Sequence, residues 1–323
     1  MIAKECSITL RIQKLEALLK GRLSPQHLKY SEVAAEYSNR MAGYRGEKSL
    51  DFHLSMLEDS KYYIFHGLRL LYRNYYFQID NFLLCSSFGL ILEVKNMAGE
   101  LRFEKKFNQM FQKKKESIER KTNPVLQAKL QAIKLKKWLK EHNCPEIPIY
   151  YLFVNSNAKT IIMTEPGNEQ INRFICNSEF LIEKITQLEN ANKTEILDSK
   201  ELRKIKRLLL ANHTPENPDI LAHFNLSKKD SLTGVQCPEC NYLPMYYKGG
   251  LWVCPKCRKK SKTAHLKALE DYFLLISPSI TNKELRQFLH IDSINIAQKI
   301  LFSMNLPFTG RFKDRVYHQP PIK

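Results

Sequence analysis

The sequence lacks an apolar run long enough to cross a lipid bilayer. Its longest apolar segments, residues 82–94 and 147–154, are shorter than the roughly 18 residues that a membrane-spanning helix needs. Residues 1–10 also lack the continuous apolar region of a secretory signal peptide. These absences predict a chain that is neither embedded in a membrane nor secreted.

Acidic residues are scarce relative to basic ones. The chain has 33 Asp and Glu residues against 51 Lys and Arg residues, so its formal net charge is +18. Such an excess of one sign favours a polyanionic partner, because it otherwise only adds self-repulsion. Nucleic acid is the first candidate for this partner, and a membrane surface is the second.

The cysteines show little sign of a disulfide framework. Four of the eight have no pairing logic in their spacing, namely Cys6, Cys85, Cys144 and Cys176. Free thiols are typical of a reducing compartment, so we expect a cytoplasmic protein. The length of 323 residues allows two or three domains.

A predicted β-hairpin over residues 77–96 carries the most informative polar residues. Two apolar segments flank a turn at residues 85–89, and a hairpin closed about Ser86 and Ser87 places Asp80 opposite Glu93. Side chains alternate along a strand, so Lys95 shares the face of Glu93. Two acids and a lysine therefore converge on one patch of sheet.

This convergence predicts a divalent metal site. Adjacent carboxylates repel each other unless a cation or a proton intervenes. Carboxylate oxygens are the ligands that Mg²⁺ prefers, with Mn²⁺ as the alternative, and Asp80 with Glu93-Val94-Lys95 has the form of a PD-(D/E)xK nuclease signature. A strand face with ordinary salt bridges is the competing interpretation of the same residues.

Other segments occur in the order of a known family. They are Gly46-Glu47, Gln78-Ile79-Asp80, Gly89, Glu93-Val94-Lys95-Asn96, Gly99 and Asn123-Pro124-Val125-Leu126-Gln127. Together they resemble the nuclease-related domain family, NERD, over about residues 41–180. The resemblance implies an α/β fold of the restriction-endonuclease type, with a mixed sheet flanked by helices. It also implies phosphodiester hydrolysis, with roles for Glu47 as a third acid and for Gln127 as a residue that positions water.

A basic segment follows the hairpin, and its lysines are candidates for phosphate contacts. These are Lys105, Lys106, Lys113, Lys114 and Lys115. A solvated charged surface is the alternative. If the lysines do contact phosphate, binding should weaken as salt rises.

Two C-x-x-C pairs predict a zinc ribbon. The four ligands are Cys237, Cys240, Cys254 and Cys257. Four thiolates in two tight turns match a closed tetrahedral Zn²⁺ site, which is structural and not catalytic. The segment has little apolar material of its own, so we expect its folding energy to come from the metal.

The residues after the ribbon predict a small helical domain. A capping box at Thr281 and Glu284 opens a helix, and a further helix over residues 294–304 gives the pattern of a helix-turn-helix with a basic tail as a wing. In this arrangement Asn295, Gln298 and Lys299 face DNA, with Arg311 in the tail. A helical cap on the ribbon is the alternative.

The predicted organisation is an N-terminal helical arm (1–40), a nuclease-related domain (41–188), a linker with a basic helix (189–232), a zinc ribbon (233–262) and a helical, winged-helix-like domain (263–323). We expect a metal-dependent nuclease, with DNA a better candidate substrate than RNA. The alternative is a nucleic-acid-binding protein whose nuclease core is vestigial, because affinity from phosphate neutralisation survives the loss of catalytic acids.

Overall fold

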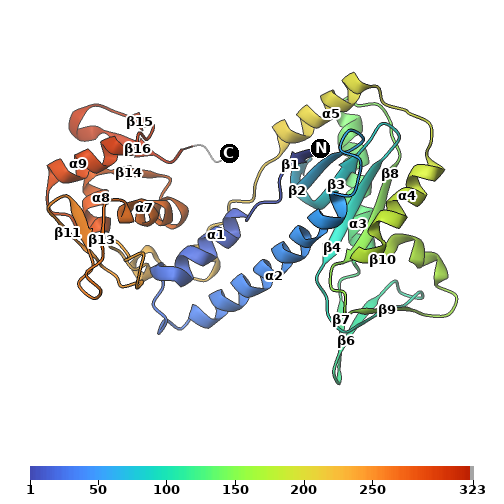
Figure 1. Ribbon diagram of the computed structural model, residues 1–323, viewed down its shortest axis with the longest axis horizontal. Helices are drawn as coiled ribbons and strands as arrows, with labels where there is room; N and C mark the ends of the chain where they lie inside the picture. The colour runs from blue at the N-terminus through green and yellow to red at the C-terminus, as the bar shows by residue number, and fades with distance from the viewer. Residues whose placement is uncertain (321–323) are drawn as a thin grey trace. The chain divides into compact units, whose positions relative to one another are not determined.

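The computed structural model describes residues 1–320 and divides the chain into two compact units (Figure 1). The first unit comprises Met1–Ile8 and Arg40–Pro215, and the second comprises Thr9–Asn39 and the chain from Glu216 onward. No helix within residues 1–320 combines the length and the apolar character needed to cross a membrane.

The first unit is built on a mixed six-stranded sheet with strand order β1-β2-β3-β4-β8-β10. Its strands are β1 (Ile2–Lys4), β2 (Tyr63–Tyr72), β3 (Tyr75–Leu84), β4 (Gly89–Lys95), β8 (Ile149–Asn155) and β10 (Ile175–Asn177). The β2–β3 and β3–β4 pairs are antiparallel, whereas β4 is parallel to β8. This arrangement confirms the predicted α/β class, and β4 lies in the interior of the sheet.

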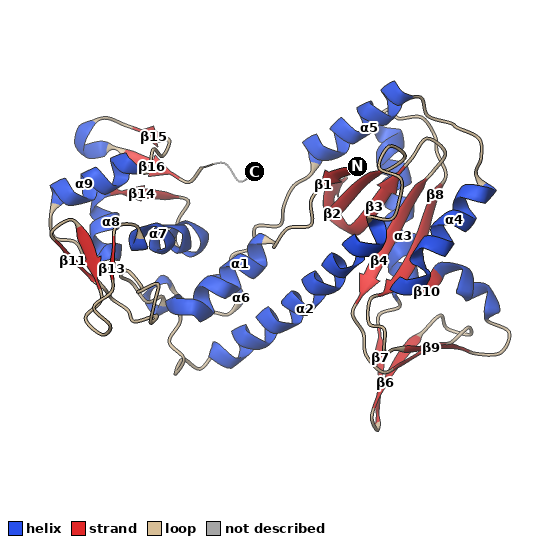
Figure 2. Cartoon of the chain, viewed as in Figure 1, coloured by secondary structure: helices blue, strands red, loops and turns tan. Residues whose placement is uncertain are grey.

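Helices cover both faces of this sheet (Figure 2). On one face, Leu50 and Leu54 of α2 (Tyr30–Leu54) share a core with α4 (Leu181–Ala191). On the other face, α3 (Pro124–Glu141) and α5 (Ser199–Asn212) pack around Trp138. The central strands are therefore buried on both sides, as their continuous apolar sequences predict.

A smaller sheet, with strand order β7-β6-β5-β9, extends from the same unit. Its strands are β5 (Glu100–Phe103), β6 (Met110–Lys114), β7 (Ser117–Lys121) and β9 (Ile161–Thr164). The β6–β7 hairpin projects beyond the main sheet (Figure 1). The basic segment of the sequence thus forms a protruding hairpin and the loop before it.

Helix α2 is longer than the sequence predicts. The predicted helical arm ends at residue 40, but a single helix runs over Tyr30–Leu54 and continues through Gly43 and Gly46. Two glycines inside a helix cost about 1 kcal/mol each relative to alanine, which tertiary packing can offset. Gly46 has a packing reason, because a Cβ there would lie 2.9 Å from Ser156 Oγ and 3.0 Å from the Cβ of Asn96. The missing side chain lets α2 approach the ends of β4 and β8.

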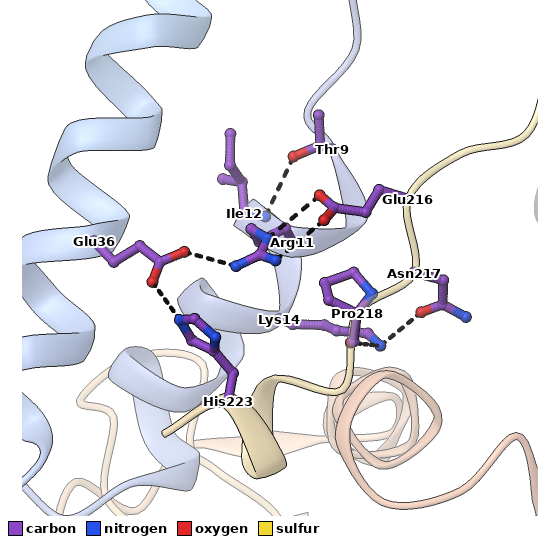
Figure 3. Close-up of polar contacts among 9 residues, drawn as sticks. All are labelled: Thr9, Arg11, Ile12, Lys14, Glu36, Glu216, Asn217, Pro218 and His223. Atoms are coloured by element: carbon purple, nitrogen blue, oxygen red, sulfur yellow. Dashed lines mark hydrogen bonds and ion pairs between the residues drawn. The ribbon is translucent and has the colours of Figure 1, made fainter. Parts of the chain in front are cut away.

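The N-terminal part of the second unit packs with residues that follow Pro215. Leu15 and Leu18, in α1 (Leu10–Ala17) and the helical turn Leu18–Arg22, share an apolar cluster with Phe224, which follows α6 (Ile220–His223). Figure 3 shows the polar contacts beside this cluster, where Arg11 bridges Glu36 at 3.0 Å and Glu216 at 3.1 Å. Residues 9–39 are thus part of the C-terminal unit.

The rest of the second unit combines the ribbon and the C-terminal helices. Its elements are β11 (Tyr246–Lys248), β12 (Leu251–Val253), β13 (Lys260–Ser261), α7 (Ala264–Leu275), β14 (Ser279–Thr281), α8 (Asn282–Leu289), α9 (Ile294–Ser303), β15 (Phe308–Thr309) and β16 (Val316–His318). The capping box of Thr281 and Glu284 is present at the start of α8. Strand β14 precedes α8, whereas β15 and β16 follow α9, and the three form an antiparallel sheet in the order β14-β16-β15. This order of elements agrees with the predicted winged helix.

The ribbon does not have a core of its own. Val235, Met245 and Trp252 belong to the same apolar cluster as Leu269 and Leu285 of the helices. Trp252 is fully buried, and its Nε1 donates to His265 Nδ1 at 3.0 Å. The expectation that metal alone stabilises the ribbon is therefore incomplete, because the helices supply most of the apolar material.

Candidate active site

The β3–β4 hairpin has the register that the sequence predicts. Asn81 pairs with Leu92 and Phe82 pairs with Ile91, so one further step places Asp80 opposite Glu93. The backbone N–H of Val94 donates to Asp80 Oδ2 at 2.9 Å. Asp80 is therefore fixed to the end of β4 by a hydrogen bond as well as by strand pairing.

Glu93 is the most enclosed of the acids, with no exposed surface. Lys95 Nζ lies 2.5 Å from Glu93 Oε1, and Gln131 Nε2 donates to Glu93 Oε2 at 2.9 Å. Burial raises the pKa of Glu93 to about 7, helped by Asp80 and opposed by Lys95 and Gln131. The carboxylate thus depends on its two partners to remain ionised.

Glu47 lies on α2, one residue after Gly46, and is half-buried. Burial raises the pKa of Glu47 to about 8, the charge of Asp80 raises it further, and Lys95 opposes the shift. Within residues 1–320, only the four ribbon cysteines bring three or more Cys, His, Asp or Glu ligand atoms within 4.8 Å of one another. Glu47 is therefore coupled electrostatically to the other acids without closing a compact three-acid cluster.

The pKa values of Asp80 and Lys95 are also shifted by burial and by neighbouring charges. Burial raises the pKa of Asp80, while Lys95 and the Val94 N–H oppose the shift. Burial lowers the pKa of Lys95, but Glu93 and Asp80 outweigh it and leave that pKa raised. Lys95 therefore stays protonated beside three acids, and Lys4 adds a weaker positive contribution at Glu47, so the site retains capacity for an added positive charge.

Among the described residues, the glutamine that hydrogen-bonds to Glu93 is Gln131. Gln131 is buried, and it lies one helical turn after Gln127 on α3. Its Oε1 is also buried and has no hydrogen-bond partner among the described residues. Gln127 is half-buried, and its backbone N–H bonds to Asn123 O in the first turn of the helix. The sequence offered a weak signal for Gln131, because it repeats Gln127 at a spacing of four.

Asn155 is a further polar residue of this region that sequence reasoning missed. It is fully buried at the end of β8 and pairs with Lys95 across the strands. Its Oδ1 accepts from the Met97 N–H at 3.0 Å, which fixes the chain as it leaves β4. Its only sequence signal is its place at the end of an apolar run.

The predicted phosphate-binding lysines of the first unit are all exposed. They are Lys105, Lys106, Lys113, Lys114 and Lys115, which lie on the β6–β7 hairpin and the loop before it. Lys105 Nζ donates to Gly167 O at 2.8 Å, so this lysine is partly engaged. The exposed ammonium groups form a basic edge on the unit that carries Asp80 and Glu93.

The four ribbon cysteines converge as a structural zinc site requires. The Sγ atoms of Cys237 and Cys257 are 3.6 Å apart, as are those of Cys240 and Cys254. A tetrahedral site with Zn–S bonds of about 2.3 Å has S–S edges of about 3.8 Å. The Cys257 N–H also points to Cys254 Sγ at 3.5 Å. The donor set and its geometry are compatible with structural Zn²⁺.

The predicted DNA-facing residues of α9 are exposed on one side of that helix. Asn295, Gln298 and Lys299 all face solvent, and Arg311 is exposed in the segment between β15 and β16. This placement agrees with a recognition helix and a wing.

Residues 42–156 match the model of the nuclease-related domain family. The match includes Glu47, Asp80, Glu93, Lys95 and both glutamines of α3. No curated protein matches the chain, and no solved structure matches it.

Proposed function

We propose, from the premise that this chain contains a nuclease-related domain at residues 42–156, that it is a metal-dependent nuclease that hydrolyses phosphodiester bonds of nucleic acid. The observation that carries the proposal is the environment of Glu93. This buried acid lies across from Asp80 and contacts both Lys95 and Gln131. The competing interpretation, a strand face with ordinary surface salt bridges, would leave Glu93 exposed to solvent, but Glu93 is buried.

Asp80 and Glu93 are the residues that would hold Mg²⁺ or Mn²⁺. Their oxygen donors suit these hard cations, and the pKa values of both acids, which burial raises, support a site that an added positive charge would stabilise. A bound divalent ion would lower the pKa of its water and neutralise phosphate charge. Glu47 adds negative charge to the same region and stays a supporting acid in this proposal.

The remaining residues orient the reactants. Lys95 is protonated and side-chain exposed by 36%, so it can donate to a phosphate oxygen where negative charge develops. Gln131 fixes Glu93 through its Nε2 and leaves its Oε1 free to accept a hydrogen bond from water. We therefore assign to Gln131 the positioning role that the family resemblance implied for Gln127.

The nucleic acid is held by parts of the chain that do not carry out the reaction. The lysines of the β6–β7 hairpin, the basic ribbon and the exposed face of α9 provide positive charge, in keeping with the net charge of +18. Phosphate neutralisation of this kind gives an affinity that falls steeply with salt. DNA is the proposed substrate, with RNA as the competing polymer in the test.

The test is cleavage of plasmid, single-stranded DNA and RNA with added Mg²⁺ or Mn²⁺. The intact protein should cleave at least one of them, whereas Asp80→Ala and Lys95→Ala should not. Cleavage that persists in both variants contradicts the site assignment.

A non-catalytic nucleic-acid-binding protein is the second candidate. One observation favours it, since the Glu93 carboxylate is fully buried, with Oε2 hydrogen-bonded to Gln131 and Oε1 2.5 Å from the Lys95 ammonium. This candidate predicts salt-sensitive binding by all three proteins and cleavage by none.

A further inference from the structure

The winged helix contains a hollow that a recognition helix alone does not explain. Asn295, Gln298 and Lys299 lie on one side of α9, and Phe302 continues that side by one turn. With Arg315 and Tyr317 they line a hollow of about 420 Å³. This volume falls in the range of roughly 300–1,000 Å³ that is typical of ligand-sized pockets.

One residue that lines the hollow is a highly exposed aromatic side chain. Phe302, which lines it, is 77% exposed, and Phe312 in the wing is 89% exposed. These two are the most exposed phenylalanines of residues 1–320. Exposed aromatic rings of this kind are costly in water, but they stack well on unpaired bases of single-stranded nucleic acid.

The polar groups of the hollow suit a base with an attached phosphate. The guanidinium of Arg315 packs over the ring of Phe308, with its Cζ 4.2 Å from the ring centroid. Its Nε is buried and has no hydrogen-bond partner among the described residues. The amides of Asn295 and Gln298 can donate to and accept from a base edge, and a lysine beside them can pair with a phosphate.

We propose that the α9–wing hollow binds an unpaired nucleobase, so that the nucleic acid held by this chain has a single-stranded region. This inference rests on the proposed function and defines its substrate class. In an intact duplex the bases are stacked and offer only their edges in the grooves, so they cannot fill a hollow beside the helix. An unpaired base presents both its ring face and its polar edge.

The test measures binding by the full chain without cleavage. The protein carries Asp80→Asn, no Mg²⁺ or Mn²⁺ is added, and fluorescence anisotropy compares a blunt duplex with the same duplex bearing a single-stranded extension. A 2-aminopurine base in the extension reports stacking through loss of its fluorescence. We expect tighter binding of the extended duplex, together with quenching of the 2-aminopurine.

Variants of Phe302 separate stacking from other contacts. Phe302→Ala should weaken binding of the extended duplex by roughly 5- to 100-fold, since stacking on one aromatic ring contributes at that scale. Phe302→Tyr keeps a ring and should bind normally, whereas Phe302→Leu keeps apolar bulk and should behave like alanine. Ile294→Ala is the matched control, because Ile294 is 60% exposed on α9 but does not line the hollow.

Two results overturn the proposal. Equal binding of both duplexes by all variants indicates conventional groove recognition, and normal binding by Phe302→Leu shows that no base stacks on the ring. The outcome is independent of catalysis. If only the nuclease proposal is wrong, the protein still binds the extended duplex more tightly but cleaves nothing. If only this inference is wrong, the protein cleaves nucleic acid but binds both duplexes equally.

Discussion

A buried ion pair in the second unit gives a quantitative test of how residues 9–39 are held. Arg22 and Asp271 have side-chain exposures of 1% and 5%, and Arg22 Nε lies 2.9 Å from Asp271 Oδ2. Arg22 Nη1 also donates to the carbonyls of Leu232 and Gly234. Removing one partner of such a pair costs about 3–5 kcal/mol, because it strands a buried charge.

The change Arg22→Met should therefore destabilise the second unit by about 3 kcal/mol, at the lower end of that range. The lower end applies because Lys267 Nζ stays 2.8 Å from Asp271 Oδ1 and still neutralises it in part. Adding Asp271→Leu removes the stranded charge but leaves the carbonyls unpaired, so the double variant should lose only about 1–2 kcal/mol.

The assay is urea unfolding followed by tryptophan fluorescence. Trp252 reports on the second unit and Trp138 on the first, so the measurement uses a Trp138→Phe background. Lys20→Met is the control, since Lys20 pairs with Glu16 on the surface with 67% of its side chain exposed. That change should cost under about 0.5 kcal/mol. The reasoning is refuted if Arg22→Met lowers the free energy of unfolding by no more than Lys20→Met does.

Three further predictions concern the metal sites and the catalytic residues. The chain should contain about one zinc per molecule, and Cys254→Ser should abolish it and make residues 233–320 sensitive to protease, which elemental analysis and limited proteolysis check; full zinc content in the variant contradicts the ribbon. Without divalent metal, the melting temperature of the first unit should fall from pH 6 to pH 8. Glu93 and Glu47, with pKa values of about 7 and about 8, bind more protons when folded than when unfolded; Mg²⁺ should reduce this fall, and a flat profile in scanning fluorimetry contradicts the coupling. Gln131→Leu should lower the cleavage rate by about 10–100-fold while Gln127→Leu changes it little, and equal effects in a kinetic assay remove the distinction.

Local sequence patterns predicted the central hairpin of the sheet. The turn residues Ser86 and Ser87 determine the register, and a symmetric closure is enough to place Asp80 opposite Glu93. The segment Asn123-Pro124, which belongs to the family resemblance, begins a helix, with the Asn123 side chain accepting from the Val125 N–H. The cysteine spacing likewise predicted the four-thiol cluster. These features depend on residues close in the chain, where turn and cap chemistry is decisive.

Features that depend on contacts between residues distant in the chain could not be predicted from local sequence patterns. The sequence around Gly43 and Gly46 does not show that α2 continues through them. The close approach that favours glycine at position 46 is to Asn96 and Ser156, which are distant in the chain. The choice of Gln131 over Gln127 depends on which face of α3 meets β4. The grouping of residues 9–39 with the C-terminal part requires Arg22 and Asp271 to meet across most of the chain.

The central claim is that Asp80 and Glu93 together bind a divalent ion, and Mn²⁺ binding followed by electron paramagnetic resonance tests it most directly. The account predicts that the intact protein binds Mn²⁺ and that Asp80→Asn and Glu93→Gln each weaken binding at least about tenfold, whereas Gln127→Ala leaves it unchanged. Mn²⁺ affinity that is the same in the intact protein and in both acid variants contradicts the claim.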